Sequence, residues 1–202
     1  MTLSYYNYIG NFHDKSVSIL SEYILPDNNP RTKCWDKRKY SDMSPDIKLL
    51  CEEACLKSNF NDLLTNPYII VERHHNILVK DSKVKNHFGE HIDSYGPAGG
   101  PCRSMLYYYQ IDPDIENSEL NFYDGAAEPV CKFHPKSGDL ISFDDGIYHC
   151  PGDFKTNSTV PVVRGVIAIF ILIENEERKA RGAAARALAK LNNKPLRCCT
   201  IS

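Results

Sequence analysis

The sequence predicts a mixed α and β protein that is mainly β, with helices before and after an antiparallel sandwich or jelly roll. From residue 67 onward, short runs rich in β-branched and aromatic residues alternate with turn clusters such as Asp124-Gly125 and Lys136-Ser137-Gly138. Before residue 67, apolar residues recur at helical spacing instead. Several short strands between turn signals are typical of a sandwich or a jelly roll.

Two helices are expected in the N-terminal region, residues 1–66, which we interpret as a helical support for the β core. Residues 14–25 carry apolar side chains at helical spacing, and Pro26 ends the pattern. Ser44 and Pro45 suit the N-cap and first position of a second helix, which runs through about Lys57. Its expected inward residues are Ile47, Leu50, Cys51 and Ala54. The polar stretch between the helices, residues 27–42, is expected to be a loop.

The β core is expected over residues 67–174. Its candidate strands are residues 68–79, 103–111, 119–123, 130–134, 139–143 and 162–173. The last strand is apolar at successive positions, as expected when both faces of a strand are covered. Residues 175–202 are expected to form an alanine-rich helix and a tail, and all three regions together make one domain.

Composition is that of an ordinary globular chain of 202 residues. Twenty-four Lys and Arg residues against 26 Asp and Glu residues give a formal charge of -2, which offers no global attraction to nucleic acid or to an anionic membrane. The N-terminus lacks the pattern of a signal peptide, and the longest apolar run, residues 166–173, is too short to span a bilayer. The eight cysteines are scattered, with no CxxC pair, which favours reduced thiols in a cytoplasmic protein.

A metal site is indicated by His91 and Asp93. Residues i and i+2 of an extended strand point to the same side, so one ion can bind both side chains. His149, 56 positions after Asp93, is the best third ligand. Two imidazoles and one carboxylate leave open coordination positions, as in non-haem iron(II) oxygenases. The alternatives are a surface His and Asp without a ligand role, and a zinc hydrolase that uses the same three residues.

Arg164 adds a second signal, because it interrupts the otherwise apolar stretch 162–168. A buried guanidinium is costly unless it is paired with an anion, and it can bind a carboxylate through two parallel hydrogen bonds. The alternative is an internal Asp or Glu as its partner. The other histidines are weaker candidates, since His74 and His75 would face opposite ways on a strand and the remaining ones stand alone.

Several motifs occur in a consistent order. They are Gly-x-His91-x-Asp93, Arg-Ser-Met-Leu-Tyr-Tyr-Tyr at 103–109, Ser-Glu-Leu-Asn-Phe-Tyr at 118–123, Phe-His-Pro-Lys-Ser-Gly at 133–138, then His149 and Arg164. This ordered set resembles the prolyl-4-hydroxylase-like branch of the 2-oxoglutarate and iron(II)-dependent dioxygenases, across roughly half of the chain. The resemblance implies a double-stranded β-helix that binds iron, with helices in front of it.

By this resemblance, His91, Asp93 and His149 match the catalytic iron ligands, and Arg164 matches the residue that binds the C5 carboxylate of 2-oxoglutarate. The family also places a hydroxyl near that carboxylate, for which Tyr107 or Tyr109 qualifies because these two share one face of a strand; the sequence does not choose the face. Many collagen-type members have Lys in place of Arg164, which points to a different subgroup. The family often has Gly-Gly where this chain has Asn117-Ser118.

The implied function is hydroxylation of a protein or peptide side chain, prolyl or lysyl, with release of succinate and carbon dioxide. Iron(II), 2-oxoglutarate and optionally ascorbate are the implied cofactors. The alternatives are a hydroxylase of a small molecule and an inactive β-helix that serves as a binding module. Loops at 27–42 and 96–101 are expected to select the substrate. The C-terminal Cys199-Thr-Ile-Ser fits a prenylation signal, which would give peripheral membrane association through Cys199.

Overall fold

The fold was analysed in a computed structural model. It describes residues 5–23, 31–60, 62–81, 83–84, 89–93, 103–125, 127–144 and 146–173. The predicted C-terminal helix, the 96–101 loop and Cys199 lie outside these residues. Within them, no helix is both long enough and apolar enough to cross a membrane.

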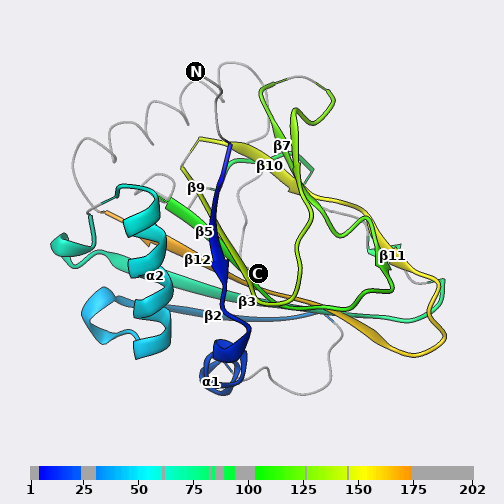
Figure 1. The fold of residues 1–202 in the computed structure, drawn as a ribbon, viewed down its shortest axis with the longest axis horizontal. Coiled ribbons are helices and arrows are strands. Elements are labelled where there is room, and N and C mark those ends of the chain that lie inside the picture. The colour runs from blue at the N-terminus through cyan, green and yellow to red at the C-terminus, as the bar shows by residue number, and fades with distance from the viewer. Residues whose placement is uncertain are drawn as a thin grey trace.

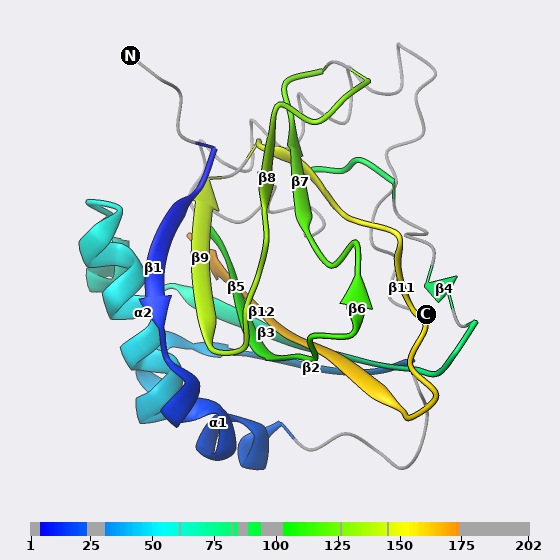
Figure 2. The same ribbon diagram turned by 45° about the vertical axis from the view of Figure 1, so that its right-hand side comes forward.

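Two β-sheets face each other and form a double-stranded β-helix, which confirms the predicted fold class (Figures 1 and 2). The larger sheet has the antiparallel order β1 (Asn7–Asn11), β9 (Asp139–Asp144), β5 (Arg103–Ile111), β12 (Val162–Leu172), β3 (Tyr68–Leu78) and β2 (Arg31–Lys39). The smaller sheet has the order β10 (Tyr148–Pro151), β7 (Leu120–Tyr123) and β8 (Cys131–Phe133). Three short strands form a separate third sheet in the order β4 (Lys83–Val84), β11 (Phe154–Thr156) and β6 (Ile115–Glu116).

The helices α1 (Ser16–Glu22) and α2 (Pro45–Lys57) cover the outer face of the larger sheet (Figure 2). The start of α2 is as predicted, because Ser44 Oγ accepts a hydrogen bond from the backbone N–H of Ile47 and Pro45 follows the cap. All four of its predicted inward residues are buried. Short 3-10 helices lie at His13–Lys15, Tyr40–Asp42 and Asp62–Thr65.

The two faces of the larger sheet carry different cores. Met105 and Tyr107 of β5 pack with Ile167 of β12 under the helices. On the opposite face, Tyr108 and Val166 pack against the smaller sheet. Since side chains alternate along a strand, even-numbered residues of β12 and of β5 up to Tyr108 point to the interior between the sheets, and the odd-numbered ones point to the helices. Beyond Tyr108 the register between β5 and β12 shifts, and Ile111 packs on the interior side.

The structure corrects the prediction for the N-terminal region. Residues 31–39, expected in a loop, form the edge strand β2, which pairs with β3 along its whole length. β1 is the strand at the other edge. The region 1–66 therefore contributes two strands to the larger sheet as well as its helical cover. The six predicted core strands all appear within one or two residues of their expected ends.

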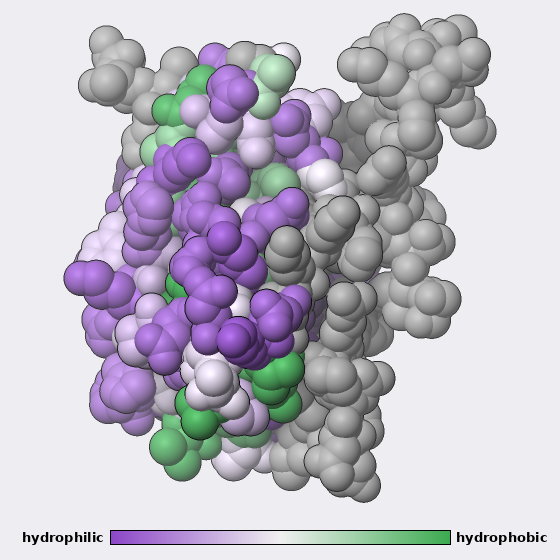
Figure 3. All heavy atoms as spheres, turned by 90° about the vertical axis from the view of Figure 1, so that its right-hand side faces the viewer, coloured by the Kyte–Doolittle hydropathy of each residue, from purple (hydrophilic) through white to green (hydrophobic). Residues whose placement is uncertain are grey.

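The face of the molecule that carries β11 is largely hydrophilic (Figure 3). Lys155 of β11 and Glu116 of β6 form an ion pair of 3.1 Å there. This end of the β-helix is polar on its outer surface, and the apolar side chains of the same short strands, Ile115 and Phe154, turn inward.

Candidate metal centre

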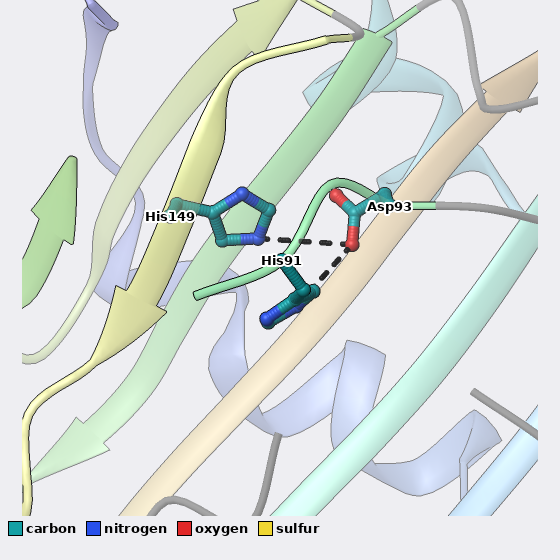
Figure 4. A group of neighbouring side chains, drawn as sticks. All are labelled: His91, Asp93 and His149. Atoms are coloured by element: carbon teal, nitrogen blue, oxygen red, sulfur yellow. Dashed lines mark ion pairs between the residues drawn. The ribbon is translucent and has the colours of Figure 1, made fainter. Parts of the chain in front are cut away.

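His91, Asp93 and His149 lie together, as the sequence predicted (Figure 4). Asp93 Oδ1 is 3.8 Å from His91 Nε2 and 3.7 Å from His149 Nε2. The three ligand atoms all lie within 4.8 Å of one another. Because bonds from such ligands to a divalent ion are about 2.0–2.2 Å long, atoms at the two measured separations can share one ion.

A backbone bridge brings the two histidines together. The N–H of His91 donates to the carbonyl of His149 at 3.1 Å, and the N–H of His149 donates to the carbonyl of His91 at 3.0 Å. Residues paired in this way project their side chains to the same side. The imidazole centroids are 4.5 Å apart as a result.

Backbone carbonyls fix the orientation of both imidazoles. His91 Nδ1 donates to the carbonyl of Gly89 and His149 Nδ1 donates to that of Ile147, each at 3.0 Å. A carbonyl oxygen only accepts, so the proton of each neutral ring is on Nδ1 and the lone pair is on Nε2. Burial, and then the nearby His149, lower the pKa of His91, which favours its neutral, ligating form.

The carboxylate of Asp93 is also held in place. Ser104 Oγ donates to Asp93 Oδ2 at 2.5 Å, so that Oδ1 is the oxygen turned toward the histidines. Asp93 is 9% exposed, and the ring of Phe143 packs against His149 with centroids 4.7 Å apart. The cluster is therefore preorganised and largely shielded from solvent. Ser104 was not among the residues that the sequence singled out.

Arg164 lies on the interior face of β12, where it is 5% exposed. Among the residues that the structure describes, its buried Nε has no hydrogen-bond partner and its guanidinium makes no ion pair. Its neighbours are the rings of Phe154, 4.7 Å away, and Tyr108, 5.7 Å away. Burial lowers the pKa of Arg164, while the charges of Tyr108 and then of Glu119 act in the opposite direction. The internal-partner alternative therefore finds no support in the described residues.

The structure places Tyr108, and not Tyr107 or Tyr109, on the face of Arg164. Tyr107 lies under the helices, where its hydroxyl is 2.6 Å from Ser16 Oγ. Tyr109 lies on the same helix-covered face, 2.7 Å from His75 Nδ1. The two candidates that the sequence offered, Tyr107 and Tyr109, thus lie on the face opposite to Tyr108 and Arg164.

The hydroxyl of Tyr108 is buried and has no hydrogen-bond partner in the part of the chain that the structure describes. Burial raises the pKa of Tyr108 to about 12, with Arg164 acting against this, so the phenol keeps its proton and can donate it in a hydrogen bond. Two unsatisfied buried donors, Tyr108 and Arg164, therefore lie side by side on the interior face that also carries Ser104.

Fold and site together define a double-stranded β-helix with a cluster of two histidines and one carboxylate that suits a metal ion. No family profile and no curated protein sequence matches the chain. Among solved structures, IDO from Bacillus thuringiensis is similar with a TM-score of 0.61 and 10% identity, over 85% of this chain and 92% of that one.

Two further solved structures have the same fold. A bsmA homolog from Methylobium petroleophilum is similar with a TM-score of 0.52 and 13% identity, over 79% of this chain and 81% of that one. A Pseudomonas putida prolyl-4-hydroxylase is similar with a TM-score of 0.52 and 13% identity, over 85% of this chain and 94% of that one. These similarities span nearly the whole of each protein and establish a shared fold.

Proposed function

We propose that this protein is a non-haem iron(II) and 2-oxoglutarate-dependent dioxygenase. One observation carries the proposal: the buried guanidinium of Arg164 lies on the same interior face as the three candidate metal ligands and has no anionic partner among the described residues. A metal site of two histidines and one carboxylate alone suits many reactions, including zinc-dependent hydrolysis. A buried cation that lacks a protein anion calls for an anionic ligand, and 2-oxoglutarate brings one carboxylate to a metal and a second to a distant cation.

Arg164 and Tyr108 would hold the distal carboxylate of 2-oxoglutarate. Both offer donors without a partner among the described residues, and hydrogen bonds to a charged group are the stronger ones. Tyr108 and Ser104 lie on the same face of β5, four residues apart, so the donors of Tyr108 and Arg164 are separated along the strand from the carboxylate of Asp93 that Ser104 holds.

His91, Asp93 and His149 would hold the iron, since two imidazoles and one carboxylate with open positions form the ligand set of non-haem iron(II) oxygenases. The chemistry that such a centre supplies is the oxygen-dependent decarboxylation of 2-oxoglutarate to succinate and carbon dioxide, coupled to hydroxylation of a substrate. The protein contributes the fixed tautomers of the imidazoles, the fixed carboxylate, and the aromatic packing of Phe143 that excludes water from His149.

The substrate that we propose is a prolyl or lysyl side chain of a protein or peptide. The ordered motifs that resemble the prolyl-4-hydroxylase-like branch motivate this choice. A small-molecule substrate is the alternative within the same chemistry. Mass spectrometry distinguishes them: a gain of one oxygen by proline- or lysine-containing peptides supports the proposal, while oxidation of small molecules alone contradicts it.

The activity itself is tested by reconstituting the purified protein with iron(II) and 2-oxoglutarate and assaying succinate after oxygen is admitted. We expect succinate from the wild type and none above background from His149→Ala. His134→Ala removes an exposed histidine away from the cluster and serves as the matched control, with wild-type turnover expected. Equal turnover in wild type and His149→Ala, or none in either, would contradict the proposal.

A lipid on Cys199 remains a separate proposal, based on the C-terminal sequence alone. Mass spectrometry of the protein expressed in a eukaryotic cell tests it, with a farnesyl adduct at Cys199 as the expected result. An unmodified C-terminus would contradict it.

A further inference from the structure

We infer that Ser104 is a positioning residue that restricts Asp93 to one ligand oxygen. The inference rests on the proposed function, since it concerns the residue that would hold the iron. Ser104 Oγ donates to Asp93 Oδ2 at 2.5 Å, within the range of a charge-assisted hydrogen bond between a hydroxyl and a carboxylate. The other oxygen, Oδ1, is the one that lies 3.8 and 3.7 Å from the two Nε2 atoms.

Ser104 stands on a strand that is paired on both sides, in the middle of the larger sheet. It lies in β5, paired with Phe143 of β9 on one side and with Phe170 of β12 on the other, and it is 1% exposed. Asp93, in contrast, lies outside the named strands, two residues after the isolated bridge between His91 and His149. The hydroxyl of Ser104 therefore fixes the carboxylate to a strand in the middle of the sheet.

The hydrogen bond decides how many coordination positions the carboxylate can take. A carboxylate with both oxygens free can bind a metal ion through both of them. With Oδ2 engaged by Ser104, Asp93 offers Oδ1 alone, and three protein ligands leave the positions that a bidentate 2-oxoacid and dioxygen require. Ser104 thereby acts through Asp93 and without touching the metal or the substrate.

A purely structural role for Ser104 makes a different prediction, and Ser142 provides the matched control. Ser142 lies on β9, is 0% exposed, and its Oγ is 2.9 Å from Ser58 Oγ. Ser142→Ala thus removes a buried hydroxyl and its hydrogen bond from the adjacent strand, on the helix-covered face. If Ser104 merely stabilised the sheet, the two alanine variants would behave alike.

The test is metal binding by the intact chain, measured by anaerobic titration with iron(II) and with cobalt(II), whose visible spectrum reports coordination. Loss of a group that hydrogen-bonds to a metal ligand lowers metal affinity by about 10- to 100-fold, which is the effect expected for Ser104→Ala. Its saturated cobalt spectrum should also differ from that of the wild type. Ser142→Ala should match the wild type within about twofold in affinity, and in its spectrum, because the cluster keeps its hydrogen bonds.

Each other outcome overturns the inference. Wild-type affinity in Ser104→Ala, an equal loss in both variants, or a loss of affinity with an unchanged cobalt spectrum would each remove the positioning role while leaving the proposed iron site in place. Absence of metal binding by the wild type would overturn the proposed function, and the role of Ser104 with it.

Discussion

Replacing Arg164 by Met separates a ligand-binding arginine from a structural one, because the two readings predict opposite effects on stability. Met is close to Arg in length and lacks its charge. In the structure the Arg164 side chain is 5% exposed, with a buried and unsatisfied Nε and no ion pair among the described residues. Its favourable contacts are those with the rings of Phe154 and Tyr108.

The expected change in stability on replacing Arg164 by Met follows from the burial of its charge and from its contacts with the two rings. Removing an ion from water costs several kcal/mol, and replacing buried charges by apolar residues of similar volume is neutral or stabilising by about 1–4 kcal/mol. The two cation–π contacts offset part of the cost, at about 2 kcal/mol each when desolvated. We therefore expect the free energy of unfolding of Arg164→Met, without ligand, to equal or exceed that of the wild type.

The affinity of Arg164→Met for 2-oxoglutarate, in contrast, should fall. Truncating one partner of a buried, hydrogen-bonded charge pair costs about 2–5 kcal/mol, or roughly 30-fold to several thousand-fold in affinity. Chemical denaturation of the metal-free protein measures the first quantity, and anaerobic calorimetric titration of the metal-loaded protein measures the second. Metal affinity should be unaffected.

Arg73→Met is the matched control, since Arg73 points to the helix-covered face and is satisfied there. Arg73 Nη1 donates to the carbonyl of Tyr23 at 2.6 Å, and its Nε donates to the hydroxyl of Tyr109 at 3.3 Å. Its loss should destabilise the protein and leave 2-oxoglutarate binding intact. The reasoning is refuted if Arg164→Met is the variant that loses stability, or if it binds 2-oxoglutarate like the wild type.

Two further predictions use the same measurements. Tyr108→Phe removes a buried hydroxyl that has no partner among the described residues, so stability should be kept while 2-oxoglutarate affinity falls by about tenfold or more. Tyr107→Phe loses hydrogen bonds to Ser16 and to the carbonyl of Phe12, so it should instead cost about 1–3 kcal/mol of stability and leave affinity unchanged. The reverse pattern in calorimetry and thermal unfolding would contradict the assignment of the faces. Gly165→Ala would place a Cβ 2.2 Å from Cζ of Tyr109, so it should cost about 1–3 kcal/mol. An unchanged melting temperature would show that this contact is not as close as described.

The interior strands and α2 could be predicted from the sequence because short-range patterns of residues specify them. α2 begins at a Ser-Pro pair whose capping role needs no tertiary contact, and its apolar stripe is periodic. The edge strand β2 was missed because its sequence, Arg-Thr-Lys-Cys-Trp-Asp-Lys-Arg-Lys, lacks alternating apolar residues. An edge strand has one paired neighbour, and charged residues, Lys above all, protect its free side.

The candidate site was predictable as far as spacing and residue type allow. His91 and Asp93 could be predicted because they are two residues apart, and His149 because it follows the other motifs in a consistent order along the chain. The choice between Tyr108 and its neighbours needed the structure, since β5 is buried on both faces and no polar alternation marks the interior one. Ser104 was missed for a related reason: its contact with Asp93 depends on where the chain returns after 11 residues.

We propose that His91, Asp93 and His149 together bind iron(II) and, through it, 2-oxoglutarate. The visible absorption spectrum of the anaerobic protein mixed with iron(II) and 2-oxoglutarate tests this directly, because chelation of the metal by the 2-oxoacid produces a charge-transfer band. We expect a band in the wild type, its loss in His149→Ala, and its appearance in Arg164→Met only at much higher 2-oxoglutarate concentration. A wild-type protein that shows no band, or a band that survives unchanged in His149→Ala, would contradict the proposed binding site.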